Sequence, residues 1–198
     1  MAPDSSPAAL LLIDVVNDLE FDGGEKLMKP ALAAAKRIAA LAERARSRDI
    51  PVVYANDNFG RWRSDFRQVV EHCLDEDVRG RPIVELLRPQ PDDYFVLKPK
   101  HSAFFSTTLA TLLEYLKVTR LILAGFASDQ CVLLTAADAY VRDFEIYTPR
   151  DCAAAQSAAN NRKAFEYMAR VFHADTRPSA KLDLARLARR QKRSSGRK

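Results

Sequence analysis

The chain alternates short apolar segments with longer segments of helical periodicity along nearly its whole length. Residues 9–14 form a nearly continuous apolar run that ends in an aspartate, which is typical of a strand covered on both faces. The same pattern predicts further strands at 52–55, 94–97, 121–124, 144–147 and 171–173. Helices are expected at 30–46, 65–74, 82–87, 106–116, 130–142, 157–170 and 182–190. Repeated strand–helix units join parallel strands by right-handed crossovers, so we expect a three-layer α/β/α fold around a six-stranded, mainly parallel sheet.

We expect residues 1–185 to form a single domain and residues 186–198 to form a basic, disordered C-terminal tail. The tail carries seven Lys/Arg residues and no acid, which leaves 24 basic against 26 acidic residues in the rest of the chain. The formal net charge of +5 therefore comes from the tail. A basic tail can bind nucleic acid, and this stays an alternative function. We expect no nucleic-acid partner, because no aromatic residue is interleaved for base stacking.

The three cysteines are scattered and form no CxxC pair, which argues against a disulfide scaffold or a zinc ribbon. A reducing, cytoplasmic setting is the expectation. The apolar run at 8–13 is far too short to span a bilayer and has no basic segment before it, so we expect neither a membrane association nor a signal peptide. No GxGxxG or GxxxxGK[ST] motif occurs, so a nucleotide cofactor is not predicted.

Three expected strands bring a reactive side chain to the same edge of the sheet. Asp14 ends the first strand, Lys98 follows the third and Cys131 follows the fourth. Open parallel sheets bind ligands at the carboxyl ends of their strands. There Asp14 could act as a general base, and Lys98 and a helix N-terminus could lower the pKa of the Cys131 thiol. Taken singly, Cys131 could instead be a small buried hydrophobe, Asp14 could cap a turn and Lys98 could extend its amine from a strand end.

The chain resembles the isochorismatase-like cysteine hydrolases, which include nicotinamidases, N-carbamoylsarcosine amidase and ureidoacrylate amidase. The resemblance spans roughly residues 8–175, and three blocks carry it: LLIDVVND at 11–18, KPKHSAF at 98–104 and AGFASDQCV at 124–132. It implies a catalytic triad of Asp14, Lys98 and Cys131. It also implies a cis peptide bond between Phe126 and Ala127, with the N–H groups of Ala127 and Cys131 forming an oxyanion hole. A homo-oligomer, a dimer or a tetramer, is implied as well.

The implied reaction is hydrolysis of a C–N bond in a small amide, ureide or carbamoyl compound through a thioester on Cys131. Isochorismatases proper cleave a vinyl ether without a nucleophilic cysteine, and that chemistry remains the alternative. Nicotinamidases resemble one another in an Asp–His–His metal cluster after the second strand. Residues 56–62 of this chain read NDNFGRW and hold no histidine, so we expect no metal and no other cofactor.

The segment 56–66 is the expected specificity loop beside the strand ends. Phe59 and Trp62 could cover a substrate, and Arg61 or Arg63 could hold a carboxylate, although Trp62 could equally pack under its own loop with the arginines facing water. Leu19 and Phe126 complete the predicted substrate contacts. We expect His101 to have a structural role as a hydrogen-bonded side chain, and contact with the substrate is the alternative. Cys73 and Cys152 are expected to be structural.

Overall fold

The computed structural model describes residues 5–57, 65–75 and 77–189 and confirms the predicted α/β fold. The strands of these residues are β1 (Ala8–Ile13), β2 (Val52–Asp57), β3 (Tyr94–Lys98), β4 (Arg120–Phe126), β5 (Glu145–Tyr147) and β6 (Ala153–Ala154). They form one parallel sheet in the order β3-β2-β1-β4-β5, and β6 pairs with the carboxyl end of β4.

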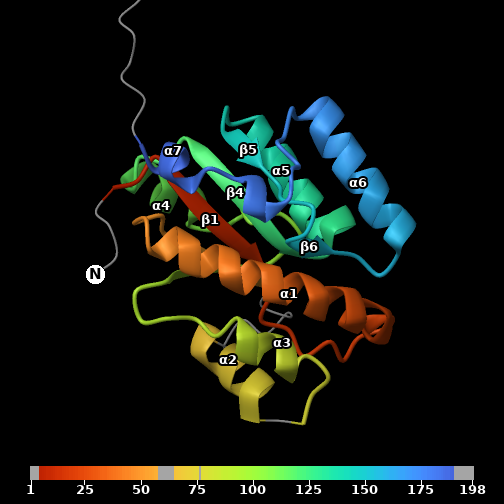
Figure 1. Ribbon diagram of the computed structural model, residues 1–198. Coiled ribbons are helices and arrows are strands. Elements are labelled where there is room, and N and C mark those ends of the chain that lie inside the picture. Colours follow the sequence, from red (N-terminus) through yellow and green to blue (C-terminus); the bar gives the residue numbers. More distant parts are fainter. Residues whose placement is uncertain (1–4, 58–64, 76, 190–198) are drawn as a thin grey trace, which may run out of the picture.

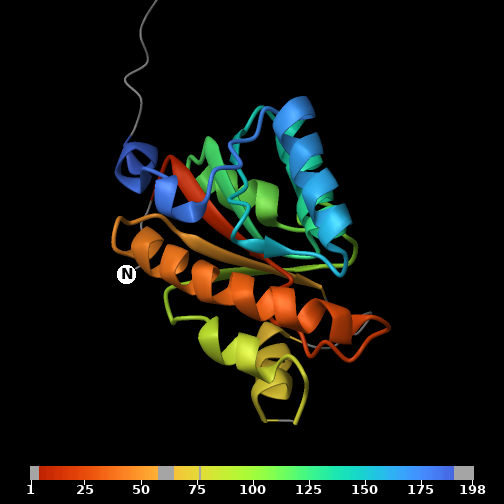
Figure 2. The ribbon, with the colours of Figure 1, turned by 45° about the vertical axis from the view of Figure 1, so that its right-hand side comes forward.

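Helices cover both faces of this sheet, as Figures 1 and 2 show. The α-helices are α1 (Gly24–Arg46), α2 (Phe66–Asp75), α3 (Arg81–Leu86), α4 (Leu109–Tyr115), α5 (Leu133–Tyr140), α6 (Ala158–Val171) and α7 (Leu184–Ala188). A π-helical turn, η1 (Ser128–Val132), precedes α5, and a 3₁₀ turn, η2 (Ser179–Lys181), precedes α7. In Figure 1, α1 lies on one side of the sheet and α5 and α6 lie on the other.

The central strand β1 is fully buried because its two faces enter two separate hydrophobic cores. Leu10 and Leu12 pack with residues of α1, α3 and α7, whereas Leu11 and Ile13 pack with residues of α4, α5 and α6. Alternate residues of a strand point to opposite faces, so a strand between two helical layers must be apolar throughout. This packing fixes β1 and its carboxyl end in the middle of the molecule.

One expected strand and one expected helix start were wrong. Residues 171–173 form no strand: α6 ends at Val171, and the ring of Phe172 packs against Tyr140 and Tyr167. The sixth strand is β6, whose two alanines give too short an apolar signal to predict. Helix α1 begins at Gly24, six residues before the expected start at Pro30.

The helix expected at 130–142 starts instead with the π-helical turn at Ser128, and α5 follows at Leu133. Its hydrogen bond from Val132 N–H to the Ala127 carbonyl spans five residues instead of four. The wider turn is therefore located where the chain leaves β4, beside the predicted nucleophile.

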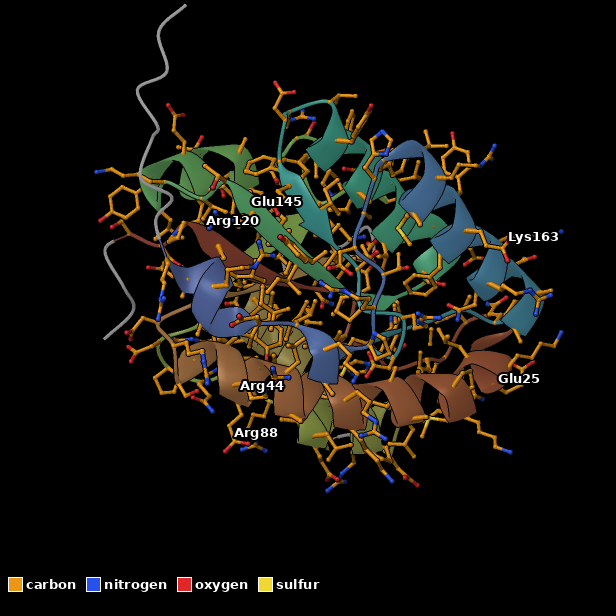
Figure 3. All side chains as sticks on the ribbon, turned by 45° about the horizontal axis from the view of Figure 1, so that its top comes forward. Glu25, Arg44, Arg88, Arg120, Glu145 and Lys163 are labelled. Carbon is orange, nitrogen blue, oxygen red and sulfur yellow. The ribbon has the colours of Figure 1, made fainter. Side chains whose placement is uncertain are left out.

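Two arginines hold the C-terminal segment against the body of the protein (Figure 3). Arg44 of α1 donates hydrogen bonds to the carbonyls of Ser179 and Leu182, and Arg120 of β4 donates to the carbonyls of Leu187 and Arg189. Arg120 also pairs with Glu145 at 3.0 Å. The first basic residue after 185, Arg186, thus belongs to the packed helix α7.

Among the described helices, none combines the length and the apolar character needed to cross a bilayer.

Candidate active site

Four chemically active side chains meet at the carboxyl edge of the sheet. Asp14 follows β1, Asp57 ends β2, Lys98 ends β3, and Cys131 lies in η1 directly after β4. Parallel strands place their carboxyl ends at one edge, so residues far apart in the sequence become neighbours there. The structure therefore brings Asp14, Lys98 and Cys131 together, as the sequence predicted.

Lys98 lies at the centre of this cluster. Its Nζ is 2.8 Å from Oδ2 of Asp14 and 3.7 Å from Sγ of Cys131, and it donates a hydrogen bond of 3.2 Å to the Lys100 carbonyl. The Lys98 side chain is completely buried, and Asp14 and Cys131 are 6% and 8% exposed. A single ammonium group thus contacts both the carboxylate and the sulfur.

Asp14 is held in place by the neighbouring strand. Its Oδ1 accepts a hydrogen bond of 2.8 Å from the Asp57 N–H, and its own N–H donates to the Ala55 carbonyl. Asp14 has a positive φ of 52°, a conformation that an aspartate tolerates better than most residues. The side chain therefore has one oxygen on the backbone of β2 and the other on Lys98.

Asn56 fixes the turn that follows Asp14, and the sequence did not single it out. Its side chain is completely buried and bonds Val16 twice: Oδ1 accepts from the Val16 N–H at 3.2 Å, and Nδ2 donates to the Val16 carbonyl at 2.5 Å. A buried amide that satisfies both backbone groups of one residue locks that residue in place. The only signal in the sequence was its position directly after an apolar run.

Asp57 is the second residue that sequence reasoning passed over. Its Oδ2 lies 3.7 Å from Nζ of Lys98, and the two residues are register partners on adjacent strands. The strand was expected to end at residue 55 because asparagine and aspartate are uncommon in strands. Pairing with β3 extends β2 by two residues and puts a second carboxylate beside the buried lysine.

The turn from β4 into η1 depends on a glycine. Gly125 has a φ of +129°, and a Cβ on it would lie 2.0 Å from the carbonyl oxygen of Ile13. Only glycine allows β4 to approach β1 this closely at that backbone conformation. The peptide bond between Phe126 and Ala127 is cis. The oxyanion hole assigned to the N–H groups of Ala127 and Cys131 stays a prediction.

A partly buried hydrogen bond ties this turn to α6. The hydroxyl of Ser128, which is completely buried, lies 2.5 Å from Oδ1 of Asn161. Ser128 opens the π-helical turn, three residues before Cys131. The bond therefore restrains the segment that presents the sulfur.

The pKa of the Cys131 thiol moves in the direction opposite to the one expected. Burial, together with the negative charge of Asp14, raises it to about 12, and Lys98 only partly opposes this rise. Burial also raises the pKa of Asp14, with Lys98 acting against it. Burial disfavours the charge on Lys98, but Asp14, Cys131 and Asp57 outweigh it and raise the Lys98 pKa. At neutral pH Cys131 is therefore a thiol, and Lys98 is an ammonium ion.

The other two cysteines fit the structural interpretation. Cys73 in α2 and Cys152 before β6 are both buried, and burial raises the pKa of each thiol to about 12. Both belong to the hydrophobic core that includes the buried residues of α1.

His101, which was expected to have a structural role, lies next to the sulfur of Cys131. Its Nδ1 lies 3.7 Å from Sγ of Cys131, and its ring is exposed. It borders a surface hollow of about 570 Å³, which Lys100, Phe105 and Leu134 also line. The histidine thus stands between the candidate nucleophile and the solvent.

The predicted substrate contacts have different outcomes. Leu19 and Phe126 are 1% and 2% exposed and pack in the core beneath α1, so in this structure neither presents an open surface. Phe59, Arg61, Trp62 and Arg63 lie outside the described residues. Contact of any of these side chains with a substrate stays a prediction.

Within residues 5–57, 65–75 and 77–189, no group of three or more His, Cys, Asp or Glu side chains could hold a metal ion. His72 Nε2 lies 3.2 Å from Oδ2 of Asp18. The expectation of a metal-independent site still rests on the sequence.

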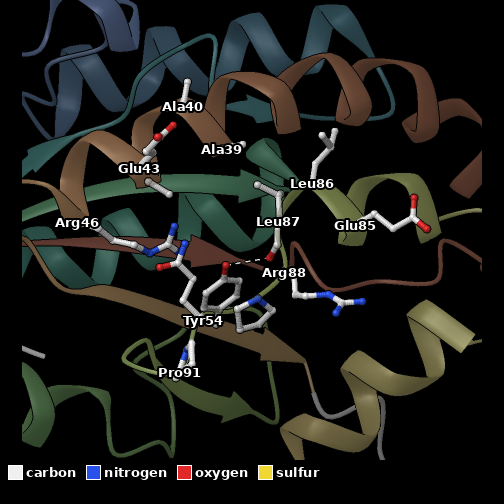
Figure 4. A pocket seen from close by; sticks show the side chains of 13 residues that line it. Ala39, Ala40, Glu43, Arg46, Tyr54, Glu85, Leu86, Leu87, Arg88 and Pro91 are labelled. Atoms are coloured by element: carbon white, nitrogen blue, oxygen red, sulfur yellow. Dashed lines mark hydrogen bonds between the residues drawn. The ribbon is translucent and has the colours of Figure 1, made fainter. Parts of the chain in front are cut away.

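A second pocket lies at the opposite end of the sheet, near the start of β2 and β3 (Figure 4). It has a volume of about 600 Å³ and is bordered by α1, α3 and the segment 87–91. Tyr54 donates a hydrogen bond of 2.8 Å to the Leu87 carbonyl there, and Arg46 pairs with Asp93 at 2.6 Å. None of its lining residues belongs to the cluster around Lys98.

Comparison with known proteins places the chain in a family. The model of the Isochorismatase domain matches residues 8–177. An uncharacterized isochorismatase family protein of Bacillus subtilis, YaaI, is 41% identical over 167 residues, which cover 84% of this chain and 91% of that protein. A probable inactive nicotinamidase of Arabidopsis thaliana is 30% identical, over 69% of this chain and 74% of its own length.

Among solved structures, N-carbamoylsarcosine amidase from Thermoplasma acidophilum superposes with a TM-score of 0.68 at 26% identity, over 89% of this chain and 98% of that one. The match of the family model covers β1 through the end of α6, and so includes all four strand-end side chains described above. The chain therefore belongs to the isochorismatase family of hydrolases.

Proposed function

We propose that this protein hydrolyses a C–N bond of a small amide, ureide or carbamoyl compound, with Cys131 as the nucleophile and Asp14 as the proton acceptor. The observation that carries the proposal is the position of Lys98 Nζ, 2.8 Å from Asp14 and 3.7 Å from the sulfur of Cys131. A weak nucleophile becomes reactive when a base stands beside it and a third group orients the base.

The resting charges suit proton transfer within the site. The Cys131 pKa of about 12 means that free thiolate is scarce at neutral pH. The raised pKa of Asp14 makes its carboxylate a stronger base than an ordinary aspartate. As the sulfur attacks the carbonyl carbon, the thiol proton passes to Asp14 and Lys98 stabilises the negative charge that develops.

The cycle then continues with release of the leaving nitrogen and hydrolysis of the thioester. Collapse of the tetrahedral intermediate breaks the C–N bond, and Asp14 returns its proton to the leaving nitrogen, which departs as ammonia or an amine. Water then attacks the thioester carbonyl while Asp14 takes its proton. The C–S bond breaks, the acid product leaves, and the thiol regains its proton from Asp14.

Similarity to an N-carbamoylsarcosine amidase structure supports C–N hydrolysis over cleavage of a vinyl ether. The position of the Cys131 sulfur, 3.7 Å from Lys98 Nζ, supports C–N hydrolysis further, because hydrolysis of a vinyl ether needs no nucleophilic thiol.

The test is a screen for ammonia release over small amides, ureides and carbamoyl compounds, using the full-length chain. Cys131→Ala serves as the blank, and Cys73→Ala, which removes a buried thiol away from Lys98, serves as the matched control. We expect turnover in the wild type and in Cys73→Ala and none in Cys131→Ala. Full turnover in Cys131→Ala would remove the nucleophile from the proposal.

A further inference from the structure

Lys98 has two carboxylate neighbours, although one carboxylate would suffice to balance its charge. Asp14 is the nearer at 2.8 Å, and Asp57 is the farther at 3.7 Å. The Lys98 side chain is completely buried, so bulk water does not screen its charge. A buried ammonium ion that loses its partner tends to release its proton instead.

That situation arises in the proposed cycle. Once Asp14 has accepted the thiol proton it is neutral, and its negative charge has moved by way of the sulfur to the oxyanion of the substrate, so the nearest carboxylate no longer balances Lys98. If Lys98 then lost its own proton, it could no longer stabilise the sulfur or the developing oxyanion. A negative group that takes no part in the proton transfers would keep Lys98 charged through every stage of the cycle.

We propose, on the basis of the function proposed above, that Asp57 is this permanent counterion and that it keeps Lys98 protonated while Asp14 carries the proton. Asp57 acts through Lys98 and is a positioning residue, with no contact to the reacting atoms required.

The location of Asp57 suits this task. Its side chain is 33% exposed and open to solvent, whereas the Asp14 side chain is nearly enclosed at 9%. Asp57 and Lys98 are paired in register across β2 and β3, which holds the two side chains side by side. The charge of Asp57 is also among the causes that raise the pKa of Lys98.

Other groups around Lys98 cannot take this role. In the described part of the chain these are the Cys131 sulfur, the Lys100 carbonyl and, beyond the sulfur, the ring of His101. The sulfur is consumed by acylation, the carbonyl is neutral, and the imidazole is never negative. Asp57 is the remaining carboxylate within 4 Å of Nζ among these neighbours.

The experiment mimics the protonated state of Asp14 with Asp14→Asn and measures the pKa of Lys98 directly. Lysine labelled with ¹³C at Cε is followed by NMR through a pH titration, and the Lys98 signal is assigned by its loss in Lys98→Met. The comparison is between Asp14→Asn and Asp14→Asn/Asp57→Asn. The backbone N–H of Asp57 that holds residue 14 is present in both variants.

We expect Lys98 to remain an ammonium ion at pH 7.5 in Asp14→Asn. Removing an opposite charge at this distance should lower its pKa in the double variant by about 1 to 3. Asp49→Asn in the Asp14→Asn background is the matched control, because it makes the same change near the other end of β2, at an exposed residue. It should leave the Lys98 pKa unchanged.

Equal Lys98 pKa values with and without Asp57 would overturn the proposal. Should the double variant not fold, the same comparison between wild type and Asp57→Asn applies, with a lower Lys98 pKa again expected in the variant. The titration involves no turnover. Loss of the proposed hydrolytic function would show as an absence of Cys131-dependent ammonia release, whereas failure of this inference would show only in the titration.

Discussion

Nζ of Lys98 lies 2.8 Å from Oδ2 of Asp14, and this ion pair is closed off from solvent at the carboxyl edge of the sheet. Both residues lie at strand ends, and Lys98 also contacts the buried thiol of Cys131. A buried pair of this kind contributes little net stability but is costly to break from one side.

Lys98→Met should destabilise the protein strongly at pH 8, because it leaves the buried Asp14 carboxylate without a cation. Breaking a buried pair from one side typically costs about 3–5 kcal/mol. Adding Asp14→Asn should recover part of this loss, since both charges are then gone. Urea unfolding of the two single variants and the double variant measures the coupling, and simple additivity of the two effects would contradict it.

The stability difference between wild type and Asp14→Asn should depend on pH. The pKa of Asp14 is raised above 3.8 in the folded protein by burial, so the folded state binds this proton more tightly than the unfolded state. Binding of this proton therefore stabilises the folded state fully at a pH below the ordinary pKa of an aspartate. The contribution is lost as the pH rises through the pKa that Asp14 has in the folded state. Relative to Asp14→Asn, the wild type should therefore lose stability as the pH rises from about 4. A difference that stays flat from acidic to neutral pH would show that the Asp14 pKa is not raised.

Alkylation of Cys131 by iodoacetamide should be slow at pH 8 and faster in Asp14→Asn. The thiol pKa of about 12 leaves little thiolate, and the charge of Asp14 is one cause of that value. The same substitution should abolish hydrolysis, so one change is expected to raise thiol reactivity and remove turnover. Peptide mass spectrometry measures modification at Cys131. Slower alkylation in the variant than in the wild type would contradict the assigned charges.

Gly125→Ala should cost more stability than the roughly 1–3 kcal/mol of a strained backbone alone. The new Cβ would meet the carbonyl oxygen of Ile13 at 2.0 Å, which forces β4 away from β1. Gly23→Ala is the matched control: that glycine also has a positive φ, of +84°, but its new Cβ would meet only the movable side chain of Gln156. Thermal unfolding should show a larger loss for Gly125→Ala, and equal losses would contradict the close approach.

The sequence predicted the parts of this structure that depend on strongly apolar strands. β1 could be recognised because both of its faces are buried, and the reactive residues could be located because each follows such a run. The positions of Asp14, Lys98 and Cys131 after apolar runs therefore predict that they lie at the carboxyl edge of the sheet.

Asp57 and Asn56 could not be found in the same way. Their strand is continued by pairing with Leu97 and Lys98 and by the bond from Asn56 to Val16, which are contacts between segments distant in the sequence. The direction of the Cys131 pKa was missed for a similar reason. The sequence shows a lysine and a helix start near the thiol, but only the fold shows how deeply the sulfur is buried.

The most direct test of the account is intact-protein mass spectrometry on a reaction quenched with acid during turnover of a substrate found in the ammonia screen. The account predicts a transient mass increase equal to the acyl part of the substrate, located on the Cys131 peptide and absent from Cys131→Ala. Turnover with no acyl adduct at any time of quenching, or an adduct that survives in Cys131→Ala, would contradict it.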